Sequence, residues 1–196
     1  MPPRSAVTVL RPRALIEVLA AGEVQFVIVG GIAAAMHGIP NETPDLDILC
    51  PRGAGNDRLL LRVLSSLGAR IKGAVETAPP LSPALLQERI VTFSTDAGEL
   101  DVIFEATGGF TFEDLKPSAI EVKVGDARVR LVSAAHLAAM KRATNRPKDQ
   151  ETVRRLEGLE ALDSADASPL PADAPTPQIN PDDWLPESRS PRPPRP

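Results

Sequence analysis

The pattern of apolar and polar residues predicts helices at both ends of the chain and strands between them. Leu15, Val18 and Leu19 have helical spacing, and Gly22 ends this segment. The β-branched run from Val24 to Val29 is typical of a buried strand. The rest of the pattern predicts a short helix over 32–37, a strand over 45–50, a helix over 57–67, hairpins joining 89–95 to 99–104 and 120–124 to 127–132, and helices over about 134–143 and 147–162.

These elements predict one mixed α/β (α+β) domain over residues 1–163, with a mixed sheet flanked by helices and with helices at its C-terminal end. Three prolines between Thr77 and Leu86 predict irregular structure there. The last 33 residues, 164–196, contain ten of the 21 prolines. We expect this segment to be a disordered tail, with Trp184 as its one candidate anchor.

Composition narrows the class of protein. The net charge is −4, and without the tail 19 basic residues face 21 acidic ones, which argues against a general nucleic-acid coat. Cys50 is the single cysteine, so neither an intramolecular disulfide nor a cysteine-based zinc site is expected. The apolar stretch Phe26 to Met36 is too short to span a bilayer, and we expect a cytoplasmic protein without a membrane partner.

Three aspartates occur where strands are expected. Asp45 and Asp47 alternate in one run, so they share a face, and Asp101 lies in a second apolar run that could bring it beside them. Aspartate is depleted in strands, and three carboxylates on one face repel each other unless a cation lies between them. The alternative is that Asp45 and Asp47 are solvated residues next to a turn.

A pair of glycines precedes this acidic motif. Gly30 and Gly31 close the first strand, and glycine at a strand-to-helix turn lets the backbone approach a phosphate. By themselves the two glycines also fit an ordinary tight turn. Together with the carboxylates they predict a Mg²⁺ site, with two ions about 4 Å apart, beside a phosphate-binding turn.

These motifs resemble a known signature. Val29-Gly30-Gly31, followed after thirteen residues by Asp45-Leu46-Asp47-Ile48 and later by Leu100-Asp101-Val102, is similar to the signature of the nucleotidyltransferase fold shared with DNA polymerase beta. The stretch from Val29 to Asp47 resembles that of small bacterial nucleotidyltransferases, which include the AbiEii-type toxins of abortive infection. Lys141 through Asp149 resembles the basic helical segment that follows the catalytic core in that group.

The resemblance implies a Mg²⁺-dependent enzyme that moves a nucleoside monophosphate from a nucleoside triphosphate to a hydroxyl of an RNA, a protein or a small molecule. It also implies a toxin role with an antitoxin protein as partner. The implied residues are Gly30, Gly31, Thr43, Lys141 and Lys148 for nucleotide binding, and Asp45, Asp47 and Asp101 for catalysis and metal binding. The two lysines fit a solvated helix face equally well.

Several residues leave other functions open. Asn41 stands where many relatives carry an arginine, so one alternative is a catalytically degenerate module of the same fold that binds a nucleotide or a partner. A second alternative, the metal motif of a nucleotide-sugar glycosyltransferase, leaves the glycines and Asp101 unexplained. His37 and His136 are expected at helix ends or in packing, and Cys50 as a small buried apolar residue.

Overall fold

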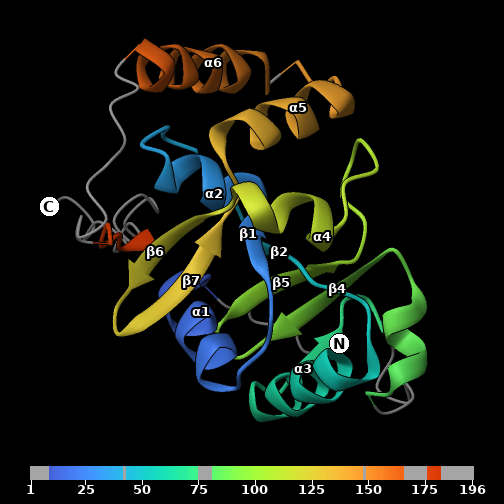
Figure 1. The fold of residues 1–196 in the computed structure, drawn as a ribbon. Helices are drawn as coiled ribbons and strands as arrows, with labels where there is room; N and C mark the ends of the chain where they lie inside the picture. Colours follow the sequence, from blue (N-terminus) through green and yellow to red (C-terminus); the bar gives the residue numbers. More distant parts are fainter. Residues whose placement is uncertain (1–8, 42, 75–80, 148, 166–175, 182–196) are drawn as a thin grey trace, which may run out of the picture.

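The computed structural model describes residues 9–41, 43–74, 81–147, 149–165 and 176–181. Its helices and strands follow the order α1 (Pro12–Ala21), β1 (Val27–Val29), α2 (Gly30–Met36), β2 (Asp45–Leu49), α3 (Ala54–Ser66), β3 (Arg70–Ile71), η1 (Pro83–Gln87), β4 (Ile90–Thr95), β5 (Gly98–Ile103), α4 (Phe112–Leu115), η2 (Lys116–Ser118), β6 (Ile120–Val124), β7 (Ala127–Leu131), α5 (Ala134–Thr144) and α6 (Asp149–Ala165). Figure 1 shows this arrangement.

The strands form one mixed sheet in the order β3-β4-β5-β2-β1-β7-β6. Strand β1 is antiparallel to β2 and parallel to β7, while β2 is parallel to β5. The mixed α/β fold predicted from the sequence is therefore confirmed. The pairing of β2 with β5 has a direct consequence for function, because it joins the two strands that carry the three aspartates.

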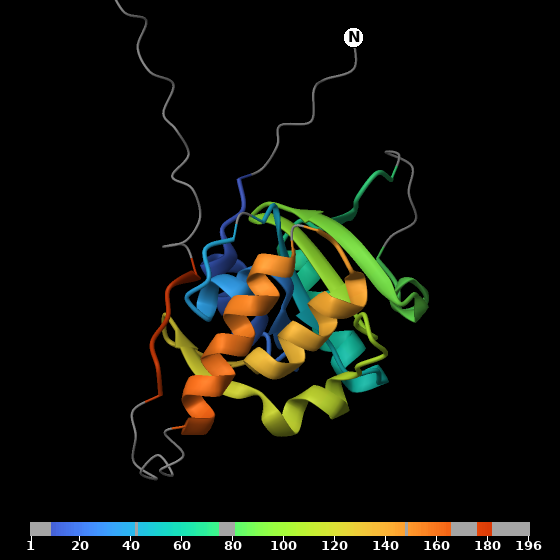
Figure 2. The same cartoon turned by 90° about the horizontal axis from the view of Figure 1, so that it is seen from above.

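Helices lie on both sides of the sheet. Helices α1 and α3 lie on one side, and α5 and α6 on the other (Figures 1 and 2). The face toward α1 and α3 is apolar, and its strand residues and the helix residues that pack on it are buried, among them Leu15, Ile16, Leu19, Ile28, Leu46, Ile48, Leu60, Leu64, Phe93, Leu100 and Val102. The opposite face carries the aspartates. This separation puts the core on one side of the sheet and leaves the other side for chemistry.

Two predicted boundaries differ from the structure for local reasons. The first strand begins at Val27 rather than Val24, because the Val24 N–H donates to the Leu19 carbonyl and the Gln25 N–H to the Asn56 side chain. Both donors are therefore unavailable to the sheet. The helix expected over 57–67 begins at Ala54. Most other predicted boundaries agree within two residues; the final helix starts at Asp149 and extends to Ala165.

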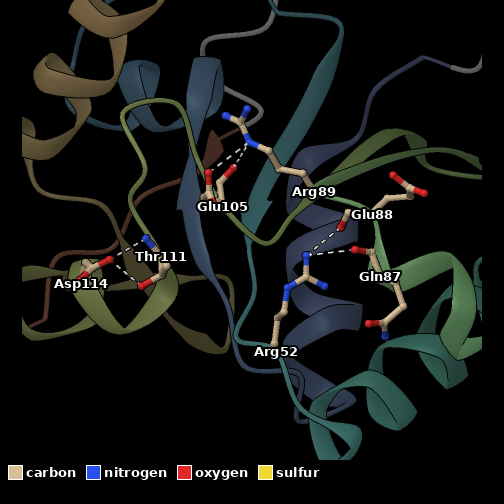
Figure 3. Close-up of polar contacts among 7 residues, drawn as sticks. All are labelled: Arg52, Gln87, Glu88, Arg89, Glu105, Thr111 and Asp114. Atoms are coloured by element: carbon tan, nitrogen blue, oxygen red, sulfur yellow. Dashed lines mark hydrogen bonds and ion pairs between the residues drawn. The ribbon is translucent and has the colours of Figure 1, made fainter.

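Short elements that the pattern did not predict fix the loops around the sheet (Figure 3). The 3₁₀ helix η1 is held by Arg52, whose guanidinium donates to three successive carbonyls, those of Leu86, Gln87 and Glu88. The same guanidinium lies 4.6 Å from the centre of the Phe104 ring. A capping box between Thr111 and Asp114 starts α4. Arg89 and Glu105 form an ion pair next to the start of β4 and the end of β5.

A short part of the proline-rich segment is ordered. In residues 176–181, Gln178 forms a parallel bridge with Lys123 of the edge strand β6. The Lys123 N–H donates to the Pro177 carbonyl, and the Ile179 N–H donates to the Lys123 carbonyl. Within the predicted tail, these six residues lie along the sheet edge, because the backbone groups of an edge strand offer partners to extended chain. Trp184 lies outside the described residues. In the part of the chain that the structure describes, no helix combines the length and the apolar character that crossing a membrane requires.

Candidate active site

The turn from β1 into α2 is built around Gly30. Its φ angle is +68°, in the region that favours glycine. A Cβ atom at this position would lie 1.9 Å from Oδ2 of Asp47. The next residue, Gly31, donates a backbone hydrogen bond to the Asp47 carboxylate. The turn predicted as a phosphate site is therefore packed directly onto one of the predicted metal ligands.

The strand register arranges the polar side chains in two rows across the sheet. Because the Lys72 N–H bonds the Thr92 carbonyl at 2.9 Å, the ladder of β3 extends one residue past the strand. The first row runs from Lys72 through Thr92 and Asp101 to Asp47, next to the glycine turn. The second row consists of Arg70, Ser94, Glu99 and Asp45. The three predicted carboxylates thus occupy one face, as the sequence predicted.

Burial and like charge act on Asp47. Its pKa is raised from 3.8 to about 7, mainly by desolvation and then by the charges of Asp45 and Asp101. The Gly31 hydrogen bond and the charge of Lys141 oppose this rise. Burial also raises the pKa of Asp101, which a hydrogen bond from Thr92 and the charge of Lys72 oppose. Oδ1 of Asp101 is buried and makes no hydrogen bond. A buried carboxylate oxygen without a partner is costly unless a cation or a proton satisfies it.

Thr43 and Asn41 support the turn from the opposite side. The Thr43 hydroxyl donates to Oδ1 of Asp45 at 2.7 Å, which fixes the orientation of that carboxylate. A Cβ atom at Gly31 would come within 2.6 Å of Thr43 and within 2.7 Å of the Asn41 amide. Thr43 was predicted to bind nucleotide, and the contact that the structure shows for it is with a predicted metal ligand. Asn41 places an uncharged amide where the resemblance implied an arginine.

These residues line a cavity of about 390 Å³ between the sheet and α5. Its lining includes Gly30, Gly31, Asn41, Thr43, Asp45, Asp47 and Asp101, a small apolar wall of Ile90, Ile103, Ala106, Leu137 and Met140, and the charged residues Lys141, Arg146 and Asp149. Seven of the eight residues predicted for the site therefore border one cavity. The eighth, Lys148, lies outside the described residues.

Lys141 is held in place by a nearly buried ion pair. Its Nζ lies 2.8 Å from Oδ1 of Asp149, and the two side chains are only 12% and 11% exposed. The Thr144 hydroxyl also donates to Asp149. Lys141 nevertheless lowers the pKa of Asp47, so its charge reaches the aspartate face. The lysine faces the cavity with most of its charge balanced by its partner.

The donor set of the cavity is rich in carboxylate oxygens. Carboxylate oxygens are the ligands that Mg²⁺ prefers, and the unpartnered oxygen of Asp101 beside Asp47 is a free donor of that kind. Among the described residues, no group of three or more His, Cys, Asp or Glu side chains is already gathered closely enough to hold a metal ion. The chemistry of the donors fits Mg²⁺.

Three members of the two rows are not predicted from the sequence. Lys72, Thr92 and Glu99 belong to the two rows, but only the register of β3 to β5 relates them to Asp101. The alternation of Glu99 with Asp101 in one strand was a signal that could have been used. The remaining candidates behave as expected. His37 ends α2 and contacts the Val132 carbonyl, His136 contacts Ser133 and Ser118, and burial raises the pKa of the Cys50 thiol.

Comparison with solved structures bears on the fold. The lincosamide antibiotic adenylyltransferase LnuA, in its lincomycin-bound crystal structure, is 12% identical in sequence to this chain. The two structures superpose with a TM-score of 0.50, and the match covers 74% of this chain and 94% of LnuA. The solution structure of the antibiotic-resistance factor ANT(2'')-Ia is 17% identical, with a TM-score of 0.48 over 78% of this chain and 89% of that one. No family model and no curated protein matches the chain. The likeness to LnuA shows that this chain has the fold of the nucleotidyltransferases.

Proposed function

We propose that the protein is a Mg²⁺-dependent nucleotidyltransferase that transfers a nucleoside monophosphate from a nucleoside triphosphate to a hydroxyl group. The observation that carries the proposal is the row in which Asp101 lies directly beside Asp47, which in turn is packed against Gly30. Two carboxylates from neighbouring parallel strands next to a glycine turn combine cation ligands with close access to a phosphate. The shared fold supports this assignment.

The charges of the cavity support a role for a cation. Four carboxylates line it, against the cations Lys141 and Arg146 among the described lining residues. Since Lys141 and Asp149 balance each other, a triphosphate would meet an excess of negative charge. Mg²⁺ held by Asp45, Asp47 and Asp101 would neutralise this charge and that of the phosphates.

The chain's own groups would have distinct roles in the reaction. The glycine turn would let the phosphates approach the backbone, and Thr43 would keep Asp45 oriented. The acceptor oxygen would bond to the α-phosphorus while the bond to the bridging oxygen breaks and pyrophosphate leaves. Asp101, whose pKa is raised, would take the proton of the acceptor hydroxyl. Positioning and charge neutralisation supply most of the rate in this chemistry.

The test is transfer of label. The protein is incubated with Mg²⁺, α-labelled triphosphates and mixtures of RNAs, proteins and small hydroxyl compounds, and the products are identified by mass spectrometry. We expect labelled product with the wild type and none with Asp45→Ala or Asp47→Ala. Asp96→Ala, on the β4–β5 turn away from the cavity lining, is the control. Transfer that persists without Asp45 or Asp47 would contradict the proposal.

A binding module without catalysis is the second candidate, and Asn41 is the observation that favours it. The amide lies against Gly31 in the cavity and supplies no positive charge for a phosphate. Calorimetric titration separates the two proposals, because a binding module would bind triphosphate with the same affinity with and without Mg²⁺ and would show no turnover. Asn41→Arg should then strengthen phosphate binding.

The biological role that goes with the proposed activity is that of a toxin controlled by an antitoxin protein. It rests on the sequence resemblance to the AbiEii-type group. Expression of the chain by itself should slow bacterial growth, and the Asp47→Ala variant should not. Equal growth of the two strains at equal protein levels would contradict this role while leaving the proposed chemistry intact.

A further inference from the structure

A basic edge of the sheet continues the row that contains Asp101. Lys72 is the fourth member of the first row, which runs from Asp47 through Asp101 and Thr92. Arg70 is the outermost member of the second row. Both basic residues are exposed. They lie at the β3 end of the rows, and the glycine turn lies at the other end. If the triphosphate occupies the glycine turn, the Lys72 end of the rows is left for the acceptor.

The side chain of Lys72 pairs with a residue on the sheet face that carries the aspartates. Its Nζ lies 2.7 Å from Oε2 of Glu99, on the strand that carries Asp101. Its charge lowers the pKa of Asp101. Glu99 and Asp101 are two residues apart on one face, a separation of roughly 7 Å along a strand. With the ammonium group at Glu99, a separation on the order of 7 Å from the carboxylate proposed to receive the acceptor's proton would match the length of one sugar phosphate.

The ion pair at Lys72 is of the kind that exchanges partners easily. Lys72 and Glu99 are 53% and 30% exposed, whereas Lys141 and Asp149 are 12% and 11% exposed. An exposed ion pair contributes little stability, so an incoming phosphate can replace Glu99 at small cost. The buried pair does not offer its lysine in this way. Of the two lysines, Lys72 is the one available to an anion from outside.

We propose that Lys72 and Arg70 form a phosphate subsite for the acceptor, so that the acceptor carries a phosphate about one sugar unit from its reacting hydroxyl. The inference rests on the proposed function and specifies its substrate class. When the phosphate binds, Glu99 releases Lys72, and the hydroxyl lies over Asp101. A polycationic amino sugar finds two positive charges at this edge and is disfavoured. The phosphate can belong to a small sugar phosphate or to the end of an RNA strand.

The experiment compares acceptors with and without a phosphate, in binding and in transfer. Ribose 5-phosphate, a short oligouridylate with a free 3′-hydroxyl, ribose and tobramycin are each titrated into protein saturated with Mg²⁺ and a non-hydrolysable triphosphate, and each is also tested for label transfer. The variants are Lys72→Glu and, as a control with the same charge change, Arg62→Glu on α3. The two phosphorylated probes distinguish a small acceptor from a nucleic acid.

We expect at least one phosphorylated probe to bind and Lys72→Glu to weaken it about ten- to a hundredfold, the loss typical of a charge-assisted hydrogen bond. KM for the triphosphate should not change, and Arg62→Glu should resemble the wild type. For oligouridylate, the dependence of log affinity on log salt should fall by about 0.7. Equal binding of ribose and ribose 5-phosphate with no oligouridylate binding, or an unchanged affinity in Lys72→Glu, overturns the subsite.

The binding measurement also separates the two levels of the argument. If no probe is labelled but phosphate binding depends on Lys72, the subsite stands and the proposed transfer fails. If transfer occurs to ribose or tobramycin as readily as to the phosphorylated probes, the transfer stands and the subsite fails.

Discussion

The contact between Gly30 and Asp47 allows a substitution whose effect can be worked out from the structure. Gly30→Ala places a methyl group 1.9 Å from Oδ2, 2.4 Å from Cγ and 2.8 Å from Cβ of Asp47. Three overlaps with one partly buried side chain, including its Cβ, cannot be relieved by a small shift of its tip. The residue also has φ +68°, which costs a non-glycine residue about 1–2 kcal/mol.

Gly38 provides a matched control. Its φ is +80°, and a Cβ atom there would meet nothing within 4 Å. Gly38→Ala therefore carries the backbone strain without the collision and should lower the free energy of unfolding by about 1–2 kcal/mol. Gly30→Ala adds overpacking of about 1–3 kcal/mol, for a total of about 2–5 kcal/mol. Displacement of Asp47 by about 1 Å should also reduce nucleotide transfer about a hundredfold.

Denaturant unfolding measures the stability difference, and transfer of labelled monophosphate measures the activity. Gly38→Ala should retain nearly full activity, whereas Gly30→Ala should lose activity and the stabilisation that Mg²⁺ gives. Equal stability losses in the two variants, together with wild-type transfer by Gly30→Ala, would show that Gly30 does not position Asp47.

Three further predictions concern other charged groups. The pKa of Asp47 rises from 3.8 to about 7 on folding, so its contribution to the free energy of unfolding is most favourable below pH 4 and is lost as the pH rises through 7. Asp47→Asn should therefore raise the melting temperature at pH 8 without divalent ions, and it should abolish stabilisation by Mg²⁺. Asp149→Ala leaves Lys141 nearly buried without its partner and should cost about 3 kcal/mol in urea unfolding, while Lys141→Met with Asp149→Leu should recover most of it. Arg52→Ala removes three hydrogen bonds and the contact with Phe104, so it should lower the melting temperature while calorimetric binding of Mg²⁺ and triphosphate stays unchanged.

The sequence predicts the main elements because their periodicity and turn residues agree with the final packing. The hairpin at Gly125 and the Ser133 cap are local signals, and the structure contains both. Helix α4 and strand β3 are too short for a periodic signal, and the order of the strands depends on contacts between distant segments. The sequence pattern therefore describes the pieces better than their arrangement.

The same holds for the candidate site, where the sequence marks some residues and only the fold relates the others to them. Asp45, Asp47 and Asp101 attract notice because charged residues interrupt apolar runs, and the register places them on one face. Nothing local marks Lys72, since a lysine after a two-residue strand is an ordinary surface residue. Its proximity to Asp101 follows only from the pairing of β3, β4 and β5. The pairing of Lys141 with Asp149 is likewise a consequence of how α5 packs on α6.

The most direct measurement is the binding of Mg²⁺ to the protein with a non-hydrolysable nucleoside triphosphate, followed by calorimetry in the wild type and in Asp45→Asn, Asp47→Asn and Asp101→Asn. The account predicts that triphosphate binds tightly only with Mg²⁺, and that each of the three substitutions weakens the binding while Asp96→Asn does not. Tight triphosphate binding that is indifferent both to Mg²⁺ and to these aspartates would contradict it.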